Sequence, residues 1–205
     1  MNIIEFQKRF APYKVFSLRD ICKVESDFSY RQLDRWEKKG YLRKVRRGFY
    51  VLDDQEMSEP FLFLVANKIY SPSYVSLEKA LKHYGLIPEE VFQITSVSTK
   101  KTVNFETTIG NFAYRNVRPD LFWGYVLVEF DGQKVMLAEP EKAILDYLYL
   151  NPRLKTFEDF VEMRINFDSF CREVDVKKFE LYLSYFGNKT LEKRAKIFLN
   201  TIQNH

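Results

Sequence analysis

Three carboxylates lie close together in one segment of the chain and are the first candidates for chemistry. Glu139, Glu141 and Asp146 stand in "AEPEKAILDYL", and neighbouring carboxylates can act as general acid and base or bind a metal ion. Pro140 is typical of a first helical turn, where acidic side chains are stabilised by the positive end of the helix dipole. Asp146 follows Lys142 by one helical turn, so we expect it either to pair with Lys142 or to cap a neighbouring loop. The pattern therefore favours structural roles for all three acids.

Other catalytic patterns are equally weak. His83 has no serine or cysteine nucleophile motif around it, which favours a packed or hydrogen-bonded histidine, and the second histidine is His205 at the last position. Nucleases that use an acid-x-Lys motif need it on adjoining strands, whereas Glu37–Lys39 and Asp175–Lys177 fall in segments predicted to be helical. The glycines form no phosphate-cradling loop. We therefore expect no catalytic residue, no metal site, no cofactor and no enzyme activity.

The two cysteines, Cys22 and Cys171, are far apart and form no CxxC motif. This excludes a disulfide framework and is typical of a cytoplasmic protein with reduced thiols. The start, "MNIIEFQKRF", carries charges every few residues and does not resemble a signal peptide. The longest uninterrupted apolar run, Phe61–Ala66, is too short to span a bilayer. We expect a cytoplasmic protein without a membrane partner.

Charge is distributed unevenly along the chain. Residues 1–52 contain thirteen Lys or Arg and six Asp or Glu, a net charge of +7, whereas the remainder has a net charge of −3. The polar segment "DDQEMSEP" (Asp53–Pro60) separates the two regions. The sequence therefore predicts two domains with different partners, one over residues 1–53 and one over residues 60–205.

The basic first region has the pattern of helices followed by a hairpin. An apolar helical face is predicted from Ile3, Ile4, Phe6 and Phe10. Ser17 and Asp20 match a capping box, and the helix that follows is expected to direct three residues inward, namely Leu18, Ile21 and Cys22.

The segment "SDFSYRQLDRWEKKG" predicts a third helix that starts at an N-cap of Asp27 or Ser29 and ends at Gly40. "YLRKV" and "GFYVL" alternate as two strands joined by Arg46-Arg47-Gly48. Three helices and a two-stranded wing make a winged helix-turn-helix.

The third helix is predicted to present a cationic face to solvent. At 100° per residue Leu33 and Trp36 fall on the inward side, opposite the basic residues. Arginine can pair with guanine, glutamine with adenine, and lysine with phosphate, which suits a recognition helix and its wing. The residues expected to bind DNA are Ser29, Arg31, Gln32, Arg35, Lys38, Lys39, Lys44, Arg46 and Arg47. Two alternatives stay open: a solvated face that binds nothing, and a winged helix used for protein contact.

The second region predicts an α+β domain with a mostly antiparallel sheet and C-terminal helices. Two helices are expected over Phe61–Tyr70 and Val75–Tyr84, then strands within 92–99, 103–109, 111–117, 124–130 and 131–138. Helices follow from Glu139, with one starting at Thr156 and two more separated by Gly187-Asn188. The aromatic residues in "FWGYVLVEF" and "LYLSYFG" either fill the core or form a patch for a protein partner.

Four segments, taken in order, resemble one family over nearly the whole chain. They are "LDRWEKKGYLRKVRRGFYVL", "SYVSLEKALKHYGL", "AEPEKAILDYL" and "YLSYFGNKTLEKRAKIFL". They are similar to successive segments of the abortive-infection AbiEi-type antitoxins, a family of predicted transcriptional regulators of viral (phage) defence systems. Trp36 stands where a second aliphatic residue is usual, and Tyr84 separates His83 from Gly85.

The resemblance implies the antitoxin of a bacterial toxin–antitoxin system. Its implied partners are a nucleotidyltransferase-like toxin and double-stranded DNA, in the form of repeats in the pair's own promoter. Composition and residue spacing by themselves indicate only a DNA-binding winged helix followed by a globular domain. The alternative is a winged-helix transcription regulator whose C-terminal domain senses a small ligand, and a large polar-lined pocket in that domain would favour it.

Overall fold

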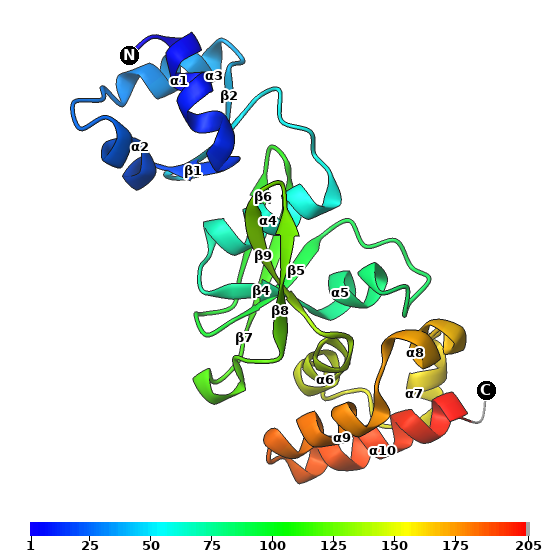
Figure 1. Cartoon of the computed structure of the whole chain (residues 1–205). Helices are drawn as coiled ribbons and strands as arrows, with labels where there is room; N and C mark the ends of the chain where they lie inside the picture. Colours follow the sequence, from blue (N-terminus) through cyan, green and yellow to red (C-terminus); the bar gives the residue numbers. More distant parts are fainter. Residues whose placement is uncertain (204–205) are drawn as a thin grey trace.

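The computed structural model describes residues 1–203, and His205 lies outside them. The molecule is elongated, with the N-terminal helices at one end, a sheet in the middle and the C-terminal helices at the other end (Figure 1). The elements form a mixed α+β protein with one antiparallel and one mixed sheet. No helix within residues 1–203 combines the length and the apolar character needed to cross a membrane.

The N-terminal part places its helices around a small antiparallel sheet of strand order β1-β3-β2. Its elements are α1 (Ile3–Phe10), the 3-10 turn η1 (Ala11–Tyr13), β1 (Val15–Ser17), α2 (Leu18–Val24), α3 (Arg31–Lys38), β2 (Leu42–Arg46) and β3 (Phe49–Leu52). The predicted helices and the hairpin are confirmed. Strand β1 was not predicted, because a three-residue strand carries almost no periodic signal.

An aromatic cluster forms the core of this part. Phe6 stacks on Phe10 with ring centres 4.4 Å apart and also contacts Trp36 at 4.9 Å. The predicted inward positions of Ile4 and Cys22 were wrong, since both side chains are exposed. Ile4 points away because Phe6 and Phe10, one turn apart, already define the buried face of α1.

Local signals explain where α2 and α3 begin and end. The capping box of α2 is confirmed, with the Ser17 amide donating to the Asp20 carboxylate at 2.8 Å. Helix α3 begins after Tyr30, which makes no side-chain cap, so the expected N-cap of Asp27 or Ser29 was wrong. Gly40 ends α3 as predicted: its φ is +72°. The amide of the next residue then donates to the Trp36 carbonyl at 2.9 Å.

The second part is built on a six-stranded sheet of order β6-β7-β5-β4-β9-β8. Within the described chain β4–β5, β6–β7 and β8–β9 pair antiparallel, whereas β4–β9 and β5–β7 pair parallel. Antiparallel pairs are the majority, as predicted, but the sheet is mixed. Its strands are β4 (Ser73–Val75), β5 (Ile94–Ser98), β6 (Val103–Thr107), β7 (Gly110–Asn116), β8 (Tyr125–Phe130) and β9 (Gln133–Ala138).

Helices cover this sheet and extend it toward the C-terminus. They are α4 (Glu59–Ile69), α5 (Leu77–His83), the 3-10 turn η2 (Pro119–Leu121), α6 (Pro140–Leu150), α7 (Phe157–Glu162), α8 (Phe167–Glu173), α9 (Val176–Tyr185) and α10 (Lys189–Gln203). Val75 lies in strand β4 and not at the start of a helix as predicted, and α8 is one helix more than expected. Both errors concern short elements, in which neighbouring contacts outweigh local propensity.

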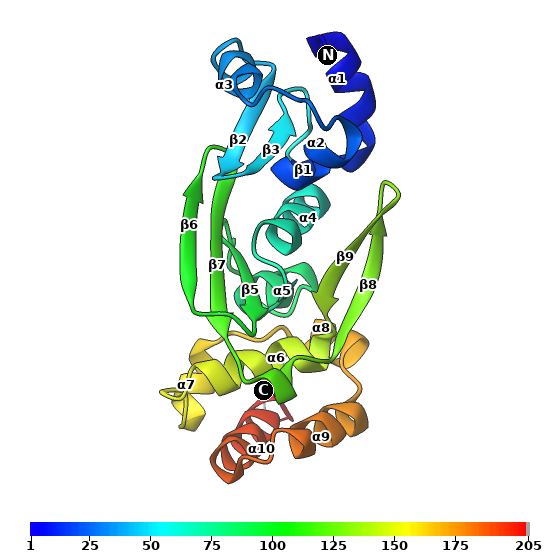
Figure 2. The same ribbon diagram turned by 90° about the vertical axis from the view of Figure 1, so that its left-hand side faces the viewer.

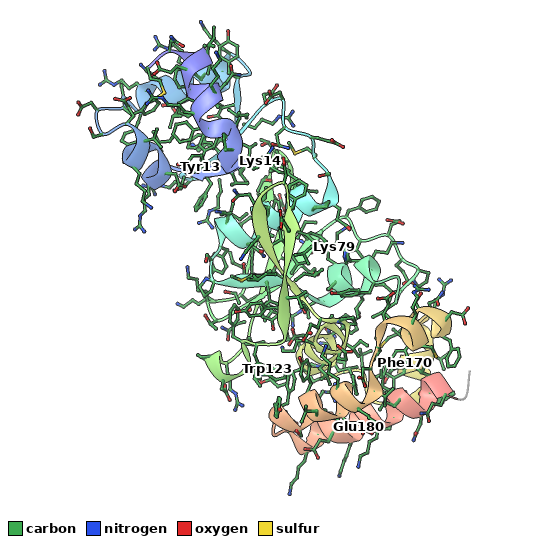
Figure 3. All side chains as sticks on the ribbon, in the orientation of Figure 1. Tyr13, Lys14, Lys79, Trp123, Phe170 and Glu180 are labelled. Carbon is green, nitrogen blue, oxygen red and sulfur yellow. The ribbon has the colours of Figure 1, made fainter. Side chains whose placement is uncertain are left out.

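The N-terminal part rests directly on the second part. The β6–β7 and β8–β9 hairpins rise on either side of α4 toward the small sheet (Figure 2). Val15, Val45 and Val51, from the small sheet, are buried in the same hydrophobic core as α4 and the large sheet. At the β8–β9 turn Asp131 forms an ion pair with Lys14, which is labelled in Figure 3. The polar segment Asp53–Pro60 therefore joins two parts that share a core.

Candidate nucleic-acid interface

The exposed face of α3 carries four unpaired cations. Leu33 and Trp36 are buried on the inner side, as the helical periodicity predicts. The basic residues on the outer side are all exposed, namely Arg31, Arg35, Lys38 and Lys39. Within residues 1–203 none of these four side chains makes an ion pair or a side-chain hydrogen bond.

Two other arginines of the same part are neutralised. Arg9 lies 2.7 Å from the Glu5 carboxylate, and Arg43 lies 2.6 Å from that of Asp53. Exposed Lys8, Arg19 and Lys23 also lack an ion pair within residues 1–203, and α3 itself carries the exposed Asp34, so α3 holds several but not all of the free cations of this part. An unneutralised cationic stripe attracts phosphate and releases counterions when it binds.

Ser29 and Gln32 occupy the start of this face. The Ser29 carbonyl accepts the amide of Gln32 at 2.9 Å, which forms the turn before α3, and the Ser29 side chain is exposed. The side-chain oxygen Oε1 of Gln32 is buried and has no hydrogen-bond partner in the described chain. Because reading adenine requires both the oxygen and the nitrogen of the amide, Gln32 is not poised for the predicted contact.

The hairpin residues divide into two kinds. Arg47 is exposed and unpaired in the described chain, whereas Arg46 donates from Nη1 to the Ile69 carbonyl at 2.8 Å. The Arg46 guanidinium also lies 4.2 Å from the ring centre of Phe105. Arg46, which was predicted to reach DNA, therefore packs against strand β6 instead.

Lys44 faces a hollow between the hairpin and the second part. The hollow has a volume of about 500 Å³ and is also lined by Glu37 and Glu106. The Lys44 carbonyl accepts a hydrogen bond from Thr108 at 3.3 Å. Two carboxylates beside Lys44 oppose the approach of a phosphate, so the predicted DNA-binding cations that remain free are those of α3 together with Arg47.

Comparison with known proteins assigns this chain to no family. The chain matches no family model, and no curated protein gives a significant match. The resemblance to the AbiEi-type antitoxins rests on the four quoted segments.

A buried polar network connects strand β4 of the large sheet to helix α6. The predicted pair of Lys142 and Asp146 is present, and neither side chain is exposed. The Tyr74 and Ser76 hydroxyls donate to Asp146 Oδ2 at 2.8 and 2.9 Å, and Lys142 Nζ donates to the Tyr74 hydroxyl at 2.8 Å. Burial lowers the pKa of Lys142 against the attraction of Asp146.

Tyr74 and Ser76 were missed by the sequence analysis. The available signal was their separation by two residues, which places both side chains on one face of a strand. The ammonium of Lys142 also lies 5.0 Å from the ring centre of Trp123 and 5.1 Å from that of Phe186. Aromatic rings and hydroxyls thus surround this fully buried pair, which suits a structural group.

The other two acids of the segment join α6 to α9. Glu139 accepts from Lys178 Nζ at 2.7 Å and from the Tyr182 hydroxyl at 2.5 Å. Burial tends to raise the pKa of Glu139, but these hydrogen bonds outweigh it and lower the pKa. Glu141 accepts the Asp175 amide at 2.9 Å at the start of α9. Both acids stand at the start of α6, as predicted.

His83 is hydrogen-bonded, as predicted. Its Nδ1 lies 3.0 Å from Glu59 Oε2, and Lys79 Nζ lies 2.7 Å from Glu59 Oε1. Burial tends to raise the pKa of Glu59, but the hydrogen bonds from Lys79 and His83 lower it. These contacts tie α4 to α5 and include no nucleophile.

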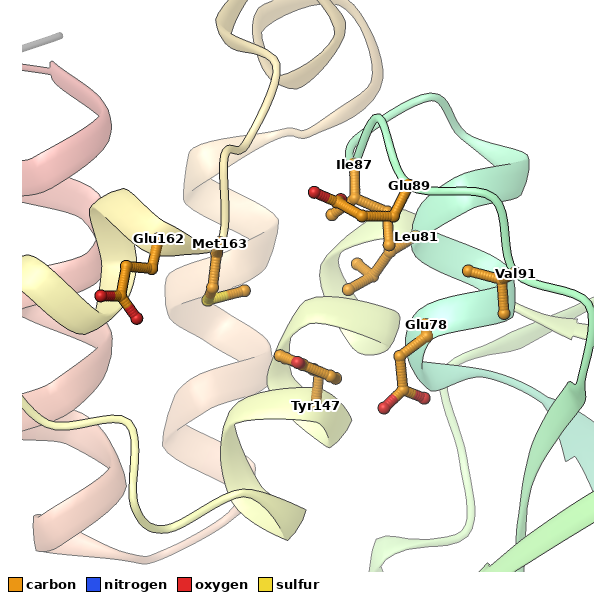
Figure 4. A pocket seen from close by; sticks show the side chains of 8 residues that line it. All are labelled: Glu78, Leu81, Ile87, Glu89, Val91, Tyr147, Glu162 and Met163. Carbon is orange, nitrogen blue, oxygen red and sulfur yellow. The ribbon is translucent and has the colours of Figure 1, made fainter.

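Two hollows adjoin each other on the second part. The first, of about 320 Å³, is largely apolar and has Tyr147, Leu81 and Met163 on its walls, with Glu78 beside them (Figure 4). The second, of about 540 Å³, is polar and shares Glu78 with the first. Its other polar lining residues are Gln93, Thr95, Thr102, Asn104 and Arg115.

Proposed function

We propose that residues 1–53 form a winged helix that binds double-stranded DNA through α3. The order α1, β1, α2, α3, β2, β3 and the antiparallel sheet support this reading, because a helix pair followed by a hairpin is the arrangement of that motif. The observation that carries the proposal is the unpaired cationic face of α3. Arg31 and Arg35 stand one turn apart on it, where they can meet guanine edges in a major groove.

The resemblance extends the proposal to the rest of the chain. We infer that the protein is the antitoxin of an abortive-infection system, which represses its own promoter and neutralises a nucleotidyltransferase-like toxin in the cytoplasm. We propose no catalytic residue, since the acids of α6 are engaged by Lys142, Lys178 and Tyr182. The second part then serves as the surface for the toxin.

DNA titrations test the first half of the proposal. Arg31→Ala with Arg35→Ala should weaken binding to the promoter duplex and relax its sequence preference, at about 1–3 kcal/mol for each lost base contact. The matched control is Lys193→Ala with Lys196→Ala, which removes the same charge from exposed positions on α10. If the control weakens binding as much as the α3 pair, net charge and not α3 accounts for the affinity.

Co-expression tests the second half. The full chain should restore growth to cells that express a neighbouring nucleotidyltransferase-like gene, and the Arg31→Ala, Arg35→Ala variant should restore it equally, because α3 is not part of the toxin surface. Failure of the folded wild-type chain to restore growth would show that the antitoxin assignment is wrong while leaving DNA binding intact.

The polar hollow favours one alternative, a regulator that senses a small ligand. Glu78 and Arg115 offer opposite charges, and Thr102 and Asn104 add hydrogen-bonding groups. A thermal-shift screen of nucleotides and amino acids tests it: a ligand that stabilises the wild type but not an Asn104→Ala, Arg115→Ala variant, and that changes promoter affinity, supports the sensor. A screen without such a ligand supports the antitoxin.

A further inference from the structure

Strand β8 leaves one edge of the large sheet open. It pairs with β9 over all six residues, from Tyr125 opposite Ala138 to Phe130 opposite Gln133, without a bulge. Within the described chain no strand pairs with its other side. The backbone amides and carbonyls on that side are a template for another strand.

The side chains of β8 are unusually apolar for an open edge. Val126, Leu127 and Val128 are consecutive and are 38%, 53% and 43% exposed. Val126 and Val128 point to one face of the strand and Leu127 to the other. The strand therefore exposes apolar surface on both faces, a feature that marks an interaction site in a soluble chain.

The opposite edge of the same sheet is protected in the usual way. Strand β6 exposes Asn104 and Glu106, and it is preceded by the exposed pair Lys100 and Lys101. Charged and polar side chains of this kind discourage strand addition. β8 contains no lysine and no proline, and its one charged residue, Glu129, stands near the end.

We propose that β8 is a dimer interface, in which two copies of the chain pair antiparallel through this strand. The argument for a second copy is self-complementarity. With Leu127 opposite Leu127 of the second copy, Val126 meets Val128 and Glu129 meets Tyr125, so every exposed apolar residue faces another and no like charges meet. A slip by one residue in one of the two directions would instead place Val126 opposite Glu129, and a slip in the other would place Val128 opposite Tyr125.

Two-fold symmetry fits the same register. In an isologous pair both copies use the same surface, so pairing through β8 leaves no β8 edge open to a further strand. The axis passes between the two Leu127 residues, and the large sheet continues from one copy into the next. The interface adjoins neither the cationic face of α3 nor the polar hollow, so its test requires neither DNA nor a ligand.

The mass of the full-length chain in solution, measured by light scattering and sedimentation over a range of concentrations, tests the proposal. The wild type should be a dimer. Leu127→Lys places two ammonium groups opposite each other and should raise the dimer dissociation constant by about tenfold or more. Leu181→Lys is the matched control, because that side chain is 50% exposed on α9 and should leave the dimer unchanged.

Charge exchange makes the test specific for the register. Leu127→Lys and Leu127→Glu should each dimerise more weakly than the wild type when alone and should form a heterodimer when mixed, because opposite charges then face each other. Circular dichroism spectra like that of the wild type would confirm that each variant is folded. A wild type that stays monomeric, or a dimer that tolerates Leu127→Lys, overturns the proposal. The monomeric result would leave the strand of a different protein as the occupant of β8.

Discussion

The guanidinium of Arg46 in β2 lies over the ring of Phe105 in β6, 4.2 Å from the ring centre. The two residues belong to different parts of the chain, and Arg46 also donates to the Ile69 carbonyl at 2.8 Å. The neighbouring Arg47 makes no such contact within residues 1–203. Adjacent arginines of one hairpin therefore have different roles, one in the contact between the two parts and one on the free surface.

Arg46→Ala should reduce stability more than DNA affinity. A cation–π contact contributes about 0.5–2 kcal/mol and a charged hydrogen bond about 1.5–3 kcal/mol, so we expect a loss of about 2 kcal/mol in the free energy of unfolding. Arg47→Ala should leave stability unchanged, weaken cognate and random DNA alike and lower the salt slope by about one. Urea unfolding and salt-dependent titrations measure both. If Arg46→Ala reduced DNA affinity more than stability, the hairpin would have to separate from the second part when DNA binds.

Removing one member of the buried pair should be far more harmful than removing both. Lys142→Met leaves Asp146 charged and unpaired in the core, which should cost about 3–5 kcal/mol of unfolding free energy. The double change Lys142→Met with Asp146→Leu should cost less than the sum of the single changes. A double-mutant cycle by urea denaturation gives the coupling energy. Additive costs would show that the two charges do not stabilise each other.

Gly124→Ala should destabilise the protein through Lys142. A Cβ at Gly124 would lie 2.9 Å from Lys142 Cγ, and the residue has a φ of +72°. Gly132 has nearly the same φ, +74°, with open space around it, so Gly132→Ala measures backbone strain alone, about 1–2 kcal/mol. The additional loss in Gly124→Ala should be about 1–3 kcal/mol, the usual cost of overpacking. Equal thermal shifts in the two variants would exclude a role for the close approach to Lys142.

Stability should fall in acid partly through Glu139. The folded pKa of this carboxyl is lowered from its ordinary value of 4.5, so the unfolded chain binds the proton more readily. Its contribution is complete above about pH 4.5 and is lost as the pH falls through the lowered folded pKa. Glu139→Gln should flatten the pH dependence of unfolding free energy in that window. Exposed Glu158→Gln, on α7, is the control and should leave the slope unchanged.

The sequence predicted most of the long elements and little of their assembly. Strands β5 to β9 and helices α3 and α6 follow clear periodicities, and Gly40 and Ser17 are local signals that the structure confirms. The three-residue strands β1 and β4 were missed, because pairing with distant strands creates them. Local sequence carries no information about those partners.

The candidate nucleic-acid interface was likewise predictable where the signal is local and not where it depends on distant contacts. The exposed side of α3 follows from helical spacing around Leu33, so it was predictable. The contact of Arg46 with Phe105 joins residues far apart in sequence, and the burial of Gln32 Oε1 depends on packing around it. The sequence left open whether the aromatic residues of "FWGYVLVEF" fill the core or form a patch, because the exposure of this segment depends on which strand ends the sheet.

Three valines of the small sheet, Val15, Val45 and Val51, are buried in the larger core. Residues 1–53 are therefore poorly suited to transplantation: grafted onto another protein they would carry an apolar face without a cover, and polar replacements would be needed to keep the graft from aggregating. Arg46, in the hairpin that follows α3, lies against Phe105 of β6, so we expect a substitution of Phe105 to loosen the contact between this hairpin and the large sheet without altering any side chain on α3.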